Sequence, residues 1–130
     1  MNKSRLFIAT VATLVLLFSQ LGFASSDEPS NSTRTLANIM NYLNHYPAPP
    51  EKRKLDKIIA DADATPHEKT IARAMKEMQH SVSDSDKQAL AKIVADSSAP
   101  QSIRDLAGVL QNLNHKPSAA DKSILKKYMW

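Results

Sequence analysis

Three equally spaced histidines are the residues whose type and position most directly suggest chemistry. His45, His80 and His115 follow one another at intervals of 35 residues, and each stands near the end of a segment with helical periodicity. The imidazole nitrogen is a common ligand of divalent transition metals, and three histidines with one open position form a known type of zinc site. A metal-binding hypothesis follows, and it depends on how closely these side chains approach one another.

Three lysines occupy a second set of equivalent positions, Lys52, Lys87 and Lys122, each directly after an acidic residue. An acidic side chain is favoured in the first turn of a helix, whereas the helix dipole does not explain the lysines. Stacked copies would turn the lysines into a ladder of positive charge that can bind an acidic partner, although a solvated face is the commoner role. We take these lysines and the three histidines as candidate partner-binding residues.

Both sets belong to a sequence repeat with a period of 35 residues. Residues 34–60 and 104–130 align without a gap, with ten identities in 27 positions. The middle copy keeps five of the ten columns, at Ala72, His80, Lys87, Leu90 and Lys92. Repeats at a fixed period indicate copies of one supersecondary unit. We expect the copies to cover about residues 34–65, 66–99 and 100–130.

Each copy has the pattern of two helices. In the first copy, apolar residues recur at helical spacing from Leu36 to Leu43 and again from Leu55 to Ile59. Thr65-x-x-Glu68 is a capping box, and Ser98-x-x-Gln101 predicts a cap for the first helix of the third copy. The sequence therefore predicts an all-α fold of three tandem helical hairpins, six helices in total. They form either a short α-solenoid or a compact helical bundle.

The period is similar to that of tetratricopeptide arrays, helical hairpins of about 34 residues that hold peptides. The Trp, Gly, Tyr and Pro signature of that family is absent from the repeats, and the link between the two helices is longer. The similarity is one of repeat length, and no residue role is transferred from it.

The spacing of stacked helices argues against a metal site. Equivalent residues on neighbouring helices lie about 8–10 Å apart, whereas each nitrogen of a zinc site lies about 2 Å from the metal. We therefore expect the three rings to stay apart, and each histidine to cap its helix or fix the following loop. Only a tightly closed bundle would bring the rings together. No metal ligand, cofactor or catalytic residue is assigned.

The N-terminus has the composition of a secretory signal peptide. Lys3 and Arg5 precede an uncharged apolar run at residues 6–18, and small residues follow. We predict a signal peptide at residues 1–24, with cleavage after Ala24 or alternatively after Ser26. Residues 25–32 are predicted to be disordered, and residues 33–130 to form the helical repeat domain. The expected location is the periplasm, or alternatively the extracellular space, with no stable membrane anchor after cleavage.

Composition excludes several classes of function. The chain has no cysteine, so thiolate metal sites, c-type haem attachment and lipidation at a cysteine are excluded. Without Lys3 and Arg5 the formal net charge falls from +4 to +2, which gives little reason to expect a nucleic-acid partner. Neither a G-x-S-x-G elbow, a glycine-rich phosphate loop nor an HExxH motif is present. We therefore do not expect an enzyme.

The sequence favours an exported, non-enzymatic binding or scaffold module for a protein or peptide partner in the cell envelope. Short repeat arrays more often provide surfaces than active sites. Two alternatives stay open: a periplasmic metal-handling protein that uses the repeated histidines, and an inhibitor or immunity protein of an envelope enzyme.

Overall fold

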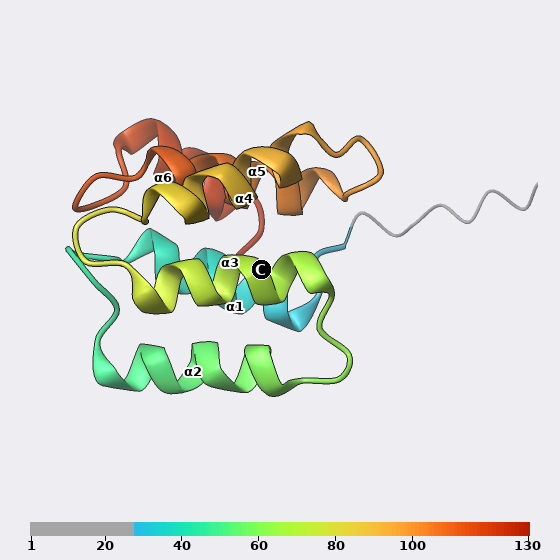
Figure 1. Cartoon of the computed structure of the whole chain (residues 1–130), viewed down its shortest axis with the longest axis horizontal. Helices are drawn as coiled ribbons and strands as arrows, with labels where there is room; N and C mark the ends of the chain where they lie inside the picture. Colours follow the sequence, from blue (N-terminus) through green and yellow to red (C-terminus); the bar gives the residue numbers. More distant parts are fainter. Residues whose placement is uncertain (1–27) are drawn as a thin grey trace, which may run out of the picture.

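A computed structural model of the chain describes residues 28–130, so the predicted signal peptide and both cleavage positions lie outside the described residues. This part of the chain contains six α-helices and no strand (Figure 1). The helices are α1 (Asn31–Asn41), α2 (Pro49–Ala60), α3 (Pro66–Glu77), α4 (Asp84–Ala95), α5 (Gln101–Asn112) and α6 (Ala119–Lys126). The predicted all-α fold of three helical hairpins is confirmed.

The hairpins close into a compact bundle. The first helices of the three copies, α1, α3 and α5, pack against one another. The second helix of each copy packs mainly on the first helix of the next copy, α2 on α3 and α4 on α5, and α6 returns to α1. Since the last helix meets the first, the copies follow one another around a common axis. Of the two predicted packings, the bundle is therefore the one found.

Equivalent positions of the three copies form the core. The apolar face of each first helix is buried around the axis, and each second helix contributes one fully buried leucine to the same core. The fully buried side chains include Leu36, Ile71, Leu106, Met40, Met75 and Leu110 from the first helices, and Leu55, Leu90 and Leu125 from the second. Full burial of such a side chain contributes about 1.5–3 kcal/mol. The repeat is thus a repeat of core positions.

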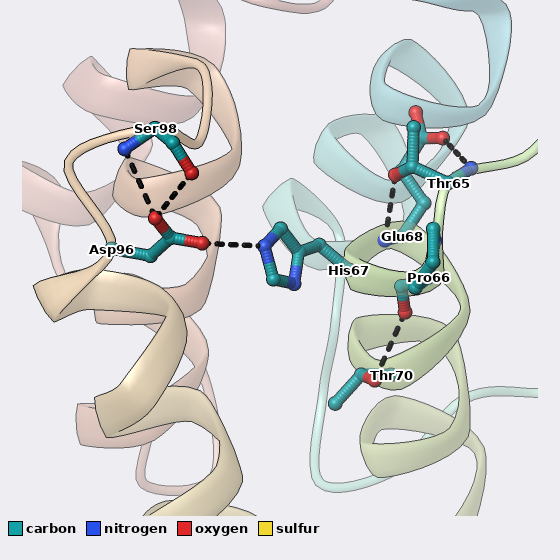
Figure 2. Close-up of polar contacts among 7 residues, drawn as sticks. All are labelled: Thr65, Pro66, His67, Glu68, Thr70, Asp96 and Ser98. Carbon is teal, nitrogen blue, oxygen red and sulfur yellow. Dashed lines mark hydrogen bonds and ion pairs between the residues drawn. The ribbon is translucent and has the colours of Figure 1, made fainter.

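Side-chain caps begin four of the six helices of the described residues, and the capping box predicted at Thr65 is confirmed. The Thr65 side chain accepts from the Glu68 N–H at 3.2 Å, and the Glu68 carboxylate accepts from the Thr65 N–H at 2.8 Å, which completes the capping box of α3 (Figure 2). Ser30 caps α1 with its side chain alone, accepting from the Thr33 N–H at 3.0 Å. As a result, α1 begins at Asn31, two residues before the predicted start of the repeat domain.

The predicted cap of α5 is wrong. Its N-cap is Pro100, which makes no side-chain cap bond. Ser98 instead donates from both its N–H and its hydroxyl to Asp96, at 2.9 and 2.5 Å. Asp96 directly follows α4, and a carboxylate two residues before a serine offers a local acceptor that competes with the cap.

Candidate metal centre

The three repeated histidines meet at one end of the bundle. The ring centroids of His45 and His80 are 5.3 Å apart, those of His45 and His115 are 5.1 Å apart, and those of His80 and His115 are 4.7 Å apart. One ring nitrogen from each histidine can be chosen so that all three lie within 4.8 Å of one another. The expectation that the rings stay apart is therefore wrong. It assumed an open stack, whereas closure of α6 on α1 gathers equivalent positions around one axis.

The loops that carry these histidines are bonded directly to one another. The His45 N–H donates to the His115 carbonyl at 2.6 Å, and the His115 N–H donates to the His80 carbonyl at 2.7 Å. His45 and His115 have φ values of 68° and 63°, in the left-handed region that non-glycine residues seldom adopt. Such a conformation persists where its surroundings hold it. Here the bonds between copies hold the histidine backbone in place.

The histidines do not cap their helices. The helices α1, α3 and α5 end at Asn41, Glu77 and Asn112, so each histidine lies beyond the last turn. Among residues 28–130, the hydrogen bonds of the three rings go to Asn44 and Asn114 rather than to helix carbonyls: His45 Nδ1 lies 2.8 Å from Asn44 Oδ1, and His115 Nδ1 lies 2.5 Å from Asn114 Oδ1. The loop-fixing role that the sequence suggested is carried by the backbone, not by the imidazoles.

The arrangement fits a single metal ion. Ligand nitrogens at about 2.0–2.1 Å from a tetrahedral zinc lie about 3.3 Å apart. The nitrogens of the three histidines, which lie within 4.8 Å of one another, therefore need to approach by up to about 1.5 Å to bind one ion. All three side chains reach the solvent, so an ion can enter and a fourth position is left open. In the described part of the chain, no carboxylate belongs to this group.

The candidate lysines lie at the same end of the bundle. Lys52, Lys87 and Lys122 are in the first turns of α2, α4 and α6, which directly follow the histidine loops. The ion pairs found among residues 28–130 do not include them. Their role as partner-binding residues stays a prediction.

A buried carboxylate at the opposite end was recognised from sequence only as a capping residue. Glu68 is 2% exposed and accepts from the hydroxyls of Ser30 and Thr33, which lie at the start of α1. Burial acts to raise the pKa of Glu68, but the hydrogen bonds from Ser30, Thr65 and Thr33 outweigh burial and hold the pKa below its ordinary value. The sequence held one sign of this contact: Thr33 and Glu68 are 35 residues apart, so they occupy equivalent positions of the repeat.

His67, the fourth histidine, makes a second contact that sequence reasoning missed. Its Nε2 lies 3.0 Å from Asp96 Oδ2, which connects the start of α3 to the end of α4 (Figure 2). The hydroxyl of Ser98 and then His67 lower the pKa of the Asp96 carboxyl. Because Ser98 donates to Asp96 and not to His67, the three residues lack the nucleophile–base contact that covalent catalysis requires. We interpret the contact as structural.

Comparisons of the chain with known protein families, with curated proteins and with solved structures give no match. Within residues 28–130, no helix has the length and apolar character needed to cross a membrane. The class of the protein is therefore described by its own features, a closed bundle of three helical hairpins in which each hairpin places one histidine at a common point.

Proposed function

We propose that the protein binds one divalent transition-metal ion with His45, His80 and His115. The observation that carries this proposal is the convergence of one ring nitrogen from each copy within 4.8 Å. A surface for a protein or peptide has no comparable geometric support, so metal handling replaces it as the leading hypothesis. Partner binding by Lys52, Lys87 and Lys122 stays a prediction from sequence.

The ligand set indicates which ions are favoured. Three imidazoles without thiolate suit zinc, copper(II) and nickel, whereas magnesium and calcium prefer oxygen ligands. Structural zinc sites use four protein ligands, and sites with three keep a position for water or another ligand. A three-ligand site open to solvent favours an ion that is taken up and released over one that is held permanently.

The proposal includes export to the periplasm, with the extracellular space as the alternative. The composition of residues 1–24 supports export. A metal site made only of imidazoles also suits an oxidising compartment, because it has no thiolate to be lost to disulfide formation. The protein would then act as a carrier or buffer of the ion rather than as an enzyme.

Isothermal titration calorimetry with zinc, copper(II) and nickel tests this function. We expect one ion per chain in the wild-type protein. His80→Ala removes one of three ligands and is expected to weaken binding by more than the roughly 10–100-fold typical of losing an outer-shell partner. His67→Ala is the matched control, because His67 lies outside the cluster, and it is expected to bind as the wild type does. Equal binding by a variant with alanine at positions 45, 80 and 115 would refute the proposal.

A further inference from the structure

We propose that Asn44 and Asn114 are positioning residues that commit His45 and His115 to coordinate metal through Nε2, with His80 as the adaptable third ligand. This inference rests on the proposed metal function and concerns how the site is prepared for the ion. It gives the three copies unequal roles, although their histidines stand at equivalent positions.

The first step is the direction of two hydrogen bonds. His45 Nδ1 lies 2.8 Å from the amide oxygen of Asn44, and His115 Nδ1 lies 2.5 Å from that of Asn114. An amide oxygen can only accept, so in this orientation of the two amides each Nδ1 carries a proton and donates it. In a neutral imidazole the lone pair is then on Nε2. Both rings are therefore prepared to bind a metal through Nε2.

The second step is that the backbone fixes the same two histidines. The Tyr46 N–H donates to the Asn44 carbonyl at 2.9 Å, and the Lys116 N–H donates to the Asn114 carbonyl at 2.7 Å. A bond between residues two apart, with a positive φ at the central residue, defines a strained γ-turn centred on each histidine. Each asparagine thus supplies its backbone oxygen to the turn and its side-chain oxygen to the ring.

The third step is the contrast with the middle copy, where Gln79 replaces the asparagine. The residues with positive φ in the described chain are His45 and His115, so His80 does not share their turn. Hydrogen bonds among residues 28–130 include none between the side chains of Gln79 and His80. His80 takes part in the network between copies only as an acceptor, through its carbonyl. Its ring packs against the rings of His45 and His115, with centroids 5.3 and 4.7 Å away, but no hydrogen bond among residues 28–130 fixes its nitrogens. His80 is therefore the ligand left to adjust to the ion.

Oxygen acceptors on the second ring nitrogen are a general property of metal-binding histidines, and their loss typically costs 10–100-fold in metal affinity. The asparagines meet this description for two of three ligands. The metal affinity is therefore expected to depend on Asn44 and Asn114, and not on Gln79.

The direct test is the tautomer of each ring, measured by nitrogen-15 NMR in the metal-free protein at a pH where the rings are neutral. We expect His45 and His115 to carry the proton on Nδ1, and His80 to populate both tautomers. A proton on Nε2 of His45 and His115 would show that each asparagine donates its amide NH2 instead, and would overturn the inference.

Zinc titrations of variants provide the second test. Asn44→Ala and Asn114→Ala are expected to weaken binding by 10–100-fold, and Asn44→Asp, which keeps an oxygen acceptor, is expected to restore it. Gln79→Ala is the matched control and should bind like the wild type. If the wild-type protein binds zinc and the alanine variants bind equally well while keeping their helicity, the positioning role is wrong and the metal function stands. If the wild type does not bind, the metal function itself fails.

Discussion

The backbone N–H of His45 donates to the carbonyl of His115 at 2.6 Å, although 70 residues separate them in the chain. This bond connects the first copy to the last, at the same place where the His115 N–H connects the last copy to the middle one. The candidate metal centre is therefore also the point where the three copies are fastened to one another. An ion bound there contacts every copy.

Metal binding is expected to stabilise the whole bundle. The unfolded chain does not hold the three histidines together, so an ion that binds the folded state shifts the unfolding equilibrium. Zinc at 100 times its dissociation constant is expected to raise the free energy of unfolding by about 2.7 kcal/mol. Thermal unfolding followed by circular dichroism measures the shift. A variant with alanine at positions 45, 80 and 115 should show none, and an equal shift in that variant would contradict the prediction.

Glu68 is expected to contribute stability that depends on pH. Its folded-state pKa lies below the ordinary value of 4.5, so the carboxylate stabilises the fold fully above that value. This contribution is lost as the pH falls through the folded-state pKa. Glu68→Gln keeps the size of the side chain but removes the charge that three hydrogen-bond donors share, the hydroxyls of Ser30 and Thr33 and the N–H of Thr65. It should cost about 1–3 kcal/mol at pH 7.

Urea unfolding of Glu68→Gln and the wild type at neutral and acidic pH measures this contribution. The difference between the two proteins should shrink on acidification. Glu51→Gln is the matched control, since Glu51 occupies the equivalent capping position in α2 but, among residues 28–130, accepts only from the exposed N–H of Ala48, at 2.7 Å. A difference that is equally large at both pH values would refute the linkage.

Tyr128 connects the C-terminal turn of the chain to α5 through a side-chain hydrogen bond. Its hydroxyl donates to Asp105 Oδ2 at 2.6 Å, and burial together with this carboxylate raises the pKa of Tyr128 to about 12. Because the pKa is raised in the folded state, the stabilisation is complete below the unfolded value and is lost as the pH rises through about 12. Tyr128→Phe is expected to cost about 1 kcal/mol, since the pair is partly exposed.

Ultraviolet titration of the phenolate and chemical unfolding test the Tyr128 prediction together. The chain has three tyrosines, and Tyr42 and Tyr46 are exposed, so Tyr42→Phe and Tyr46→Phe serve as controls that should leave stability unchanged. Loss of the phenolate signal near pH 12 is expected only in Tyr128→Phe. If Tyr128→Phe unfolds at the same urea concentration as the wild type, the contact does not stabilise the bundle.

The helices could be predicted from sequence because the spacing of the apolar residues marks the face of each helix that is buried. Leu36, Ile71 and Leu106 recur at one period and are all fully buried, so the repeat was visible as a core. Closure could not be predicted in the same way. Closure depends on the rotation between successive hairpins. The last helix, α6, contacts α1 because these rotations add up around the axis.

The prediction that the three histidine rings stay apart was wrong because the sequence did not reveal that the bundle closes. In an open stack the period keeps equivalent side chains apart, whereas in a closed ring of three the same period brings them to one point. The turns at His45 and His115 could not be predicted from sequence either, because no glycine stands at the two positions with positive φ. The signal that was present is the asparagine before each of these two histidines, since asparagine offers its side chain to a local hydrogen bond.

The missing asparagine of the middle copy leads to a gain-of-function prediction. Gln79→Asn gives His80 the same neighbour that His45 and His115 have, and should place the proton of His80 on Nδ1. The third ligand would then be prepared as the other two are, and zinc affinity should rise several-fold without an added ligand. Calorimetry on Gln79→Asn and Gln79→Ala measures the effect, with nitrogen-15 NMR reporting the tautomer of His80. A tautomer shift without tighter binding would mean that His80 must stay mobile to complete the site, because an ion of this size needs the rings to draw together.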